Sequence, residues 1–288
     1  MDSFVIRGPV RLEGSVRISG AKNAMLPLMA ATILTGGECT LRNVPDLRDT
    51  RTMMKLLEML GIPSRLESGT LTVDTAGVTS FEAPYDLVRT MRASIYALGP
   101  LLARFGQARV SLPGGCAWGP RPIEQHLKGM MSLGAKLKID HGYIDARADR
   151  LRGGRVILAM PSVGATVNII LAAALAEGET VIENAAREPE ITSLAEALIA
   201  SGVEIEGHGT AKVIIRGASS VEPFDVTVIP DRIEAGTYAA AAVITGGDVT
   251  IEDCRPDHMH AVIDKLESCG AEVTPGEDSM RVVGPGSI

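Results

Sequence analysis

The 288 residues are enough for two compact domains, and 45% hydrophobic with 22% charged residues is typical of a globular protein. The formal net charge of −7, without any run of lysines and arginines, argues against nucleic-acid or anionic-membrane partners and leaves small molecules as the expected partners. No segment approaches the roughly 18 consecutive apolar residues of a membrane helix. The first residues, MDSFVIRGPV, do not resemble a signal peptide, so we expect a cytoplasmic protein.

In chain order, VIRGPVRLEGSVRIS (residues 5–19) predicts a pair of strands. Most of the remaining chain follows a repeated pattern. Four amphipathic helical segments each end at a glycine, a typical helix C-cap because it adopts left-handed conformations without strain. These segments are RDTRTMMKLLEMLG, ending at Gly61; PIEQHLKGMMSLG, at Gly134; EITSLAEALIASG, at Gly202; and HMHAVIDKLESCG, at Gly270.

Each of these glycines is followed by a predicted hairpin, and each amphipathic helix is preceded by a more apolar helix of small residues and a strand. The unit therefore reads helix, strand, helix, strand, strand. Because the small-residue helix has almost no polar face, we expect these helices to share a core, surrounded by sheets and amphipathic helices in an α+β fold. The segment GASSVEPFDVTVIPD (217–231), with its two prolines, is the best candidate linker.

The cysteines lack C-x-x-C spacing, so we expect free thiols at Cys39, Cys116, Cys254 and Cys269. Cys116 stands apart, because in LPGGCAWGPRP (112–122) two glycines precede it and predict a mobile surface loop. Its thiol is a candidate reagent. A second group of possible ligands has irregular spacing, and we predict neither a metal site nor a cofactor. That group is Asp253, Cys254, Asp257, His258 and His260.

Six segments, in order over nearly the whole chain, form a combination more specific than any single glycine motif. They are SGAKNAMLP (19–27), APYDLVRTMRASIYALGPLLARFG (83–106), LPGGCAWGPRP (112–122), SVGAT (162–166), ENAAREPEI (183–191) and PDRIEAGTY (230–238). Together they resemble the UDP-N-acetylglucosamine 1-carboxyvinyltransferase family of bacterial enolpyruvyltransferases. The sister family of the shikimate pathway carries a Pro-Gly-Ser-Lys-like motif near its first lysine and lacks the loop cysteine, so Ala21-Lys22-Asn23 and Cys116 favour the sugar-nucleotide enzymes.

The resemblance implies an inside-out α/β barrel fold with six repeated units in two domains, of which this chain would contain four. Residues 22–229 are then expected to form a complete three-repeat domain carrying the cysteine loop, and residues 1–21 with 230–288 a partial second domain. It also implies transfer of enolpyruvyl from phosphoenolpyruvate to the 3-hydroxyl of UDP-N-acetylglucosamine, with release of phosphate, as the first committed step of peptidoglycan synthesis. The chain would stop before the family's catalytic aspartate, so we expect low activity.

The resemblance assigns roles to several residues. Cys116 is the expected general acid, and Lys22 and Asn23 are the expected contacts of phosphoenolpyruvate. For the sugar nucleotide, the expected contacts are Arg92, Arg121, Pro122, Ile123, Glu124, Gln125, Ser162, Val163 and Gly164. Ser162 is equally well explained as a plain helix N-cap. Family members commonly carry lysine where Met160 stands.

Charged residues near the expected boundary between domains are mostly explained as structural salt bridges; they are Arg187, Glu188, Glu190, Asp231 and Glu234, with Arg232 left open. A non-catalytic sugar-nucleotide-binding fragment or assembly module fits the same motifs and stays the alternative to an enzyme. The incomplete second domain would expose core surface, which favours self-association.

Overall fold

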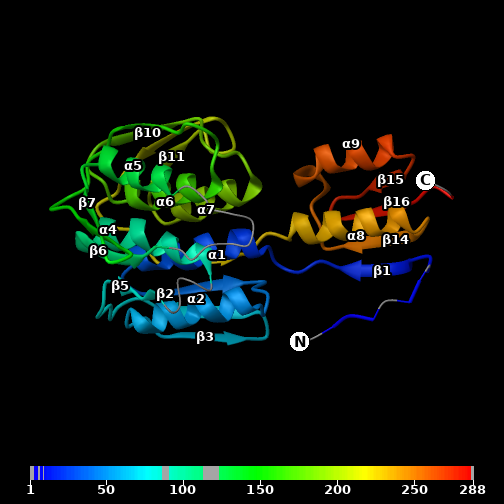
Figure 1. Cartoon of the computed structure of the whole chain (residues 1–288), viewed down its shortest axis with the longest axis horizontal. Helices are drawn as coiled ribbons and strands as arrows, with labels where there is room; N and C mark the ends of the chain where they lie inside the picture. Colours follow the sequence, from blue (N-terminus) through cyan, green and yellow to red (C-terminus); the bar gives the residue numbers. More distant parts are fainter. Residues whose placement is uncertain (1–2, 6, 9, 86–90, 113–122, 287–288) are drawn as a thin grey trace. The chain divides into compact units, whose positions relative to one another are not determined.

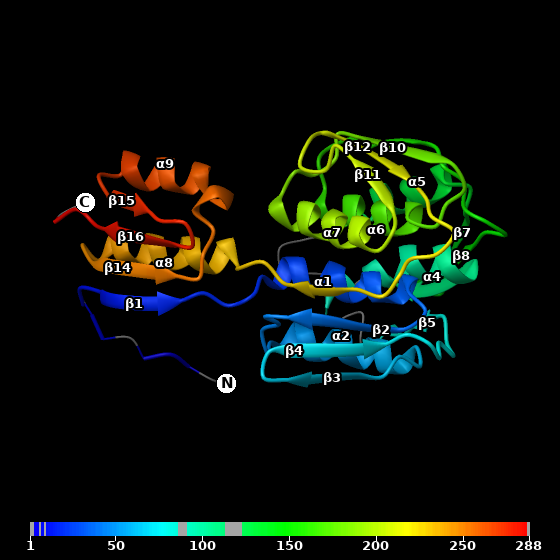
Figure 2. The same cartoon turned by 180° about the vertical axis from the view of Figure 1, so that it is seen from behind.

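The computed structural model describes residues 3–5, 7–8, 10–85, 91–112 and 123–286. They fall into two compact units, residues 22–229 and residues 1–21 with 230–288, here called the three-repeat unit and the one-repeat unit. Within the described ranges, no helix combines the length and hydropathy needed to cross a bilayer. Figures 1 and 2 show the elements of each unit.

The predicted repeat is confirmed four times along the chain, each time as helix, strand, helix, strand, strand. The first repeat contains α1 (Lys22–Ala31, continued by η1, Thr32–Leu34), β2 (Glu38–Arg42), α2 (Arg48–Met59), β3 (Ser64–Glu67) and β4 (Thr70–Asp74). The second contains η2 (Arg92–Ala97), α4 (Leu98–Phe105), β6 (Gln107–Ser111), α5 (Glu124–Ser132), β7 (Lys136–Asp140) and β8 (Tyr143–Arg147). The third contains α6 (Val163–Ala173), β10 (Glu179–Glu183), α7 (Pro189–Ala200), β11 (Glu204–Glu206) and β12 (Lys212–Arg216). The fourth contains α8 (Arg232–Ile244), β14 (Asp248–Glu252), η3 (Pro256–His258), α9 (His260–Ser268), β15 (Glu272–Pro275) and β16 (Ser279–Val283).

Each repeat builds one four-stranded sheet in the same order, in which its three strands are joined by a fourth from elsewhere in the chain. The fourth strand always pairs in parallel with the first strand of the repeat. These added strands are β13 (Asp225–Thr227) on β2, β5 (Glu82–Ala83) on β6, β9 (Arg155–Ile157) on β10, and β1 (Glu13–Arg17) on β14. The predicted linker 217–231 is thus partly a strand, since it contains β13. Of the predicted opening pair, the described residues form β1 alone.

A left-handed residue follows the first strand in two of the three-repeat unit's sheets and ties down the added strand. Asn43 (φ 56°) follows β2, and Asn184 (φ 60°) follows β10. Their side-chain amides donate to the carbonyls of Val228 and Leu158, each at 3.0 Å and each just beyond the added parallel strand. Asparagine tolerates this conformation better than most residues, because its short side chain can bond locally.

Turn chemistry explains why the repeat recurs. The four predicted C-cap glycines all adopt left-handed φ values, from 84° at Gly61 to 94° at Gly202. The hairpin between β7 and β8 turns at His141 (φ 47°) and Gly142 (φ 80°), and two positive φ values match the turn that follows the natural twist of a hairpin.

The core of the three-repeat unit lies along α1, α4 and α6, which we call the inner helices. In Figures 1 and 2 they lie between the sheet of β10 to β12 and the sheet of β2 to β4. Nearly every residue of α6 is buried, as its small and apolar sequence VGATVNIILAA requires. The inside-out α/β fold expected from the resemblance, with sheets outside and helices inside, is confirmed.

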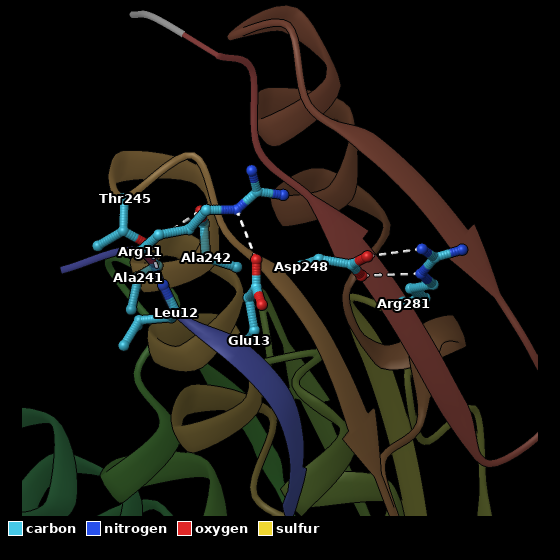
Figure 3. A network of polar contacts seen from close by, with 8 residues as sticks. All are labelled: Arg11, Leu12, Glu13, Ala241, Ala242, Thr245, Asp248 and Arg281. Atoms are coloured by element: carbon cyan, nitrogen blue, oxygen red, sulfur yellow. Dashed lines mark hydrogen bonds and ion pairs between the residues drawn. The ribbon is translucent and has the colours of Figure 1, made fainter.

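The one-repeat unit has a smaller core under α8, built around Ile251, Met280 and Val282. The two central strands of its sheet, β14 and β16, are joined by an ion pair (Figure 3), in which Arg281 donates to both carboxylate oxygens of Asp248 at 2.8 and 2.6 Å. On the other side of β14, the backbone N–H of Asp248 donates to the Leu12 carbonyl at 2.8 Å. Strand β1 is therefore held to the rest of this unit by backbone bonds.

Candidate functional site

The candidate binding residues lie at the N-terminal ends of the inner helices. Lys22 and Asn23 open α1, Arg92 opens η2 immediately before α4, and Ser162 precedes α6. The end of η2, where α4 begins, is close to the start of α6, since a Cβ on Gly164 would lie 3.8 Å from Cε1 of Tyr96. Helix α1 also contacts η2. Helix N-termini carry unpaired N–H groups and a positive partial charge, so this end of the unit suits anions.

Helix α6 begins at a conventional cap. Ser162 has extended backbone angles (φ −141°, ψ 112°), and its hydroxyl oxygen accepts a hydrogen bond from the backbone N–H of Ala165 at 3.3 Å. Val163 and Gly164 follow in the first turn, half-buried. The capping interpretation of Ser162 is therefore correct, whereas its role as a diphosphate seat stays a prediction.

The start of α5 lies beside the segment that leads into α6. Ile123 occupies the N-cap position, Glu124 is exposed, and the Gln125 side-chain oxygen accepts from the backbone N–H of Met160 at 3.4 Å. Met160 is itself largely exposed. The structure thus brings Gln125 together with the loop before Ser162, from positions far apart in the sequence.

A buried polar cluster that the sequence analysis missed lies behind these two helix starts. The side-chain oxygen of Asn168 accepts from the Gly99 N–H at 2.7 Å, and its amide nitrogen donates to the Ile95 carbonyl at 2.9 Å. The same amide nitrogen lies 3.1 Å from Nδ1 of the buried His126, next in sequence to Gln125. With the amide donating, Nδ1 accepts and the ring proton resides on Nε2. Asn168 therefore fixes α4, α5 and α6 against one another.

Close packing makes this cluster rigid. A Cβ on Gly99 would lie 2.5 Å from both the backbone and side-chain oxygens of Asn168, so no larger residue fits without movement. A Cβ on Gly164 would lie 3.2 Å from the His126 ring. The available sequence signal was one asparagine in an otherwise apolar helix, because a buried amide needs partners.

Lys22 has a partner that the sequence analysis did not name. Its ammonium lies 3.4 Å from a carboxylate oxygen of Asp49, in the first turn of α2. Both side chains are partly exposed, and Asn23 beside them is exposed. An acidic residue in a first turn is common, so the sequence gave no reason to single out Asp49. An anion bound at Lys22 would share the ammonium with this carboxylate.

A small cavity of about 330 Å³ adjoins Ser162 and is lined by Pro161, Ala185, Arg187 and Glu188. The Glu188 carboxylate accepts the backbone N–H of Arg187 at 2.9 Å. The salt bridge expected for Arg187 is not found within the described part of the chain. Its guanidinium is consequently a cationic wall next to the start of α6.

In the one-repeat unit, Asp231 and Glu234 were expected to form structural salt bridges, and both accept hydrogen bonds. Asp231 caps α8 by accepting from the N–H groups of Ile233 and Glu234 at 2.8 and 3.1 Å. The Glu234 carboxylate in turn accepts from the N–H and hydroxyl of Ser19, at 2.9 and 2.6 Å.

Three predicted site residues, Cys116, Arg121 and Pro122, lie outside the described residues, as does the side chain of Arg92. The remaining cysteines are free. Cys39 and Cys254 are buried, and burial raises the pKa of both thiols, whereas Cys269 is exposed. Over the described ranges, no three His, Cys, Asp or Glu side chains gather as metal ligands would.

Comparison with known proteins identifies the family. A family model described as EPSP synthase (3-phosphoshikimate 1-carboxyvinyltransferase) matches residues 6–288. A UDP-N-acetylglucosamine 1-carboxyvinyltransferase from Acinetobacter guillouiae is 55% identical over 279 residues, which cover 96% of this chain and 67% of the relative. A protein of the same name from Desulforapulum autotrophicum (strain ATCC 43914 / DSM 3382 / VKM B-1955 / HRM2) is 52% identical over 288 residues, covering 100% of this chain and 69% of the relative.

Solved structures agree. The enolpyruvyl transferase NikO from Streptomyces tendae superposes with a TM-score of 0.86 at 27% identity, covering 98% of this chain and 68% of that one. EPSP synthase from Acinetobacter baumannii, at 21% identity, supports the fold with a TM-score of 0.75 over 97% of this chain and 66% of its own. The chain spans about two thirds of the length of these proteins. It belongs to the EPSP synthase family of carboxyvinyltransferases, on the branch whose members are named UDP-N-acetylglucosamine 1-carboxyvinyltransferase.

Proposed function

We propose that this chain is the greater part of an enzyme that transfers enolpyruvyl from phosphoenolpyruvate to the 3-hydroxyl of UDP-N-acetylglucosamine, releasing phosphate. The observation that carries the proposal is the identity of 55% and 52% with relatives of that name over nearly the whole chain. Its setting would be peptidoglycan synthesis in the cytoplasm. The gathering of candidate residues at the inner-helix N-termini supports it, because both substrates are polyanions.

The reaction constrains which groups are needed. The sugar hydroxyl oxygen bonds to C2 of phosphoenolpyruvate while C3 gains a proton and the hydroxyl loses one. Phosphate then leaves as C3 gives up a proton and the double bond re-forms. Cys116 is proposed as the acid toward C3, since a thiol with a reference pKa near 8.5 is mostly protonated at neutral pH. Lys22 and Asn23 are proposed to hold phosphoenolpyruvate.

The sugar-nucleotide half of the site is proposed to include Arg92, Arg121, Pro122 and residues 123–125, with the diphosphate at the start of α6 beside Ser162, Val163 and Gly164. Support comes from the free N–H groups of that helix terminus and from the cationic Arg187 beside it. Family members commonly carry lysine where this chain has Met160. In this chain Arg187 would supply the positive charge instead, from the neighbouring loop.

Calorimetric titration combined with a phosphate-release assay tests the function. We expect the 288-residue chain to bind UDP-N-acetylglucosamine and to turn over slowly, because one third of each relative's length has no counterpart in it. Binding without any phosphate release would favour the alternative, a non-catalytic sugar-nucleotide-binding module. Absence of sugar-nucleotide binding would overturn the proposal.

Labelling with a thiol-reactive substrate analogue tests Cys116. Cys39 and Cys254 are protected by burial, but the exposed Cys269 would react as well. The experiment therefore uses Cys269→Ser as background, with Cys116→Ser added as the control. Mass spectrometry should find a single modification, which is absent in the Cys116→Ser control. The rate of this labelling should change when UDP-N-acetylglucosamine is present. Labelling indifferent to the substrate would contradict the assignment.

Ser162→Ala separates the two roles of that residue. A cap alone predicts a loss of about 0.5 to 1 kcal/mol in the free energy of unfolding with unchanged sugar-nucleotide affinity. A diphosphate seat predicts weaker binding in addition. Asp231→Ala, which removes the cap of α8, is the matched control for a cap outside the proposed site.

A further inference from the structure

A second cavity lies at the other end of the inner helices. It has a volume of about 810 Å³ and belongs entirely to the three-repeat unit. Leu34 after α1, Leu102 of α4 and Leu175 after α6 reach it from the three helix C-termini. Helix α6 has 11 residues, so its two ends are about 16 Å apart at 1.5 Å per residue. This cavity is thus separate from the candidate site at the N-termini.

The charge of the cavity wall is unbalanced. Three arginines, Arg104, Arg147 and Arg150, line it with one acidic residue, Asp149, giving 3 − 1 = +2. None of these four side chains forms an ion pair with any described residue. Elsewhere in the same unit arginines are commonly paired, as Arg155 is with Glu183 at 2.9 Å. An unpaired cluster of like charges costs energy unless something compensates it.

Arg104 is held in place rather than loosely exposed. Its Nη1 donates to the carbonyls of Ile33 and Thr75 at 3.0 and 3.2 Å, and its guanidinium lies 4.8 Å from the centre of the Phe105 ring. Partial burial lowers the pKa of this guanidinium, as expected for a dehydrated cation without a carboxylate. Its Nη2 faces the exposed Gly36, where a Cβ would lie 3.8 Å away, and has no acceptor within the described structure.

We propose that this cavity binds a small polyanion, such as a di- or polyphosphate or a compact polycarboxylate. Guanidinium groups bind phosphate and carboxylate oxygens in pairs, and one fixed arginine with two adjustable ones forms a suitable set of donors. Ser219 and Ser220 add hydroxyl groups to the wall. The volume lies within the ordinary range of small-molecule sites, and the leucines contributed by the helix ends give an apolar surface for the body of a ligand.

The test is calorimetric titration of the chain with pyrophosphate, ADP and citrate. The double variant Arg147→Ala/Arg150→Ala removes two exposed cations and should weaken binding at least about tenfold. The control Lys136→Ala/Arg152→Ala removes two exposed cations that do not line the cavity, and should leave affinity within about twofold. Gly36→Asp should also weaken binding, because it places a carboxylate within reach of Arg104 Nη2.

The three ligands distinguish the sources of the anion. Tighter binding of pyrophosphate and ADP than of citrate assigns a phosphorylated ligand, and the reverse assigns a polycarboxylate. Both results support the site, provided that the arginine double variant weakens binding and the control does not. Absence of binding by all three ligands, equal affinity in all variants, or displacement of pyrophosphate by excess UDP-N-acetylglucosamine would overturn the proposal. Thermal melting of each variant checks folding, and the surface double variant carries the test if Gly36→Asp does not fold.

Discussion

Helix α6 of the three-repeat unit and the corresponding helix α8 of the one-repeat unit have similar sequences but differ in how far they are buried. In α6, VGATVNIILAA lies among three repeats, and almost every residue is buried. In α8, RIEAGTYAAAAVI is equally rich in small apolar residues, but only Ala235, Ala239, Ala242 and Val243 are buried. Ile244 is 76% exposed, whereas Ile170 of α6 is 0% exposed. Apolar sequence thus identifies an inner helix, but neighbouring repeats decide whether it is covered.

The largest effect should come from the same substitution in the two helices. Ile170→Ala removes atoms from a closed core, and we expect a loss of about 3 kcal/mol in the free energy of unfolding. Ile244→Ala should cost less than about 0.5 kcal/mol. Urea unfolding followed by hydrogen exchange, which reports the two units separately, measures both. Equal losses would contradict the burial difference.

Self-association is the next effect in size. We propose that α8 associates with a second copy of the chain, because Ile233, Tyr238 and Ile244 are exposed and exposed apolar surface favours association. Ile233→Ser/Ile244→Ser should weaken that association about tenfold, or roughly 1.4 kcal/mol. Analytical ultracentrifugation over a range of concentrations measures the strength of this association. A chain that stays monomeric at every concentration would rule this out.

Helix caps offer a smaller contrast. Asp231 accepts two backbone N–H bonds at the start of α8 and adds negative charge there, whereas Ser162 accepts one at the start of α6. We expect Asp231→Ala to cost about 1 to 2 kcal/mol and Ser162→Ala about 0.5 to 1 kcal/mol. Exchange rates of the first-turn amides of each helix give the comparison. A larger effect at Ser162 would contradict the order.

The smallest effect concerns pH in the one-repeat unit. Hydrogen bonds from Arg281 hold the pKa of Asp248 below its usual value (Figure 3). Because the folded pKa is depressed, the stabilisation is present above the unfolded value near 4 and is lost as the pH falls through the folded pKa. Arg281→Gln should flatten this dependence in acid melts between about pH 5 and pH 2. Both groups are well solvated, so the change should be slight.

Much of the fold was accessible from the sequence. The C-cap glycines and hairpin turns are local signals, and Gly61, Gly134, Gly202 and Gly270 mark every repeat. Three of the four added parallel strands were not accessible, because β5 has two residues and β9 and β13 have three, too few for a pattern. Their positions depend on contacts between distant segments, such as the bond from Asn43 to Val228.

The candidate site was accessible in part. The sequence allowed Ser162 to be the N-cap of a helix, and the structure agrees. The neighbours of other candidate residues come from other elements: Asp49 beside Lys22 and Met160 beside Gln125 are brought together only by tertiary packing. Roles in the reaction came from resemblance to a family, since no local pattern distinguishes a lysine that binds phosphate from one that pairs with aspartate.

The pairing of β1 with β14 has a consequence for folding order. Glu13 lies opposite Asp248, and the whole of residues 22–229 lies between these two strands in the chain. Closing so long a loop from an unfolded chain carries a large entropic cost and slows folding. The bridge between Gly20 and Pro230 shows that the folded chain returns close to where it departed. Once residues 22–229 have folded, the two strands become near neighbours, so β1 should dock late in folding and only after its long insertion is native.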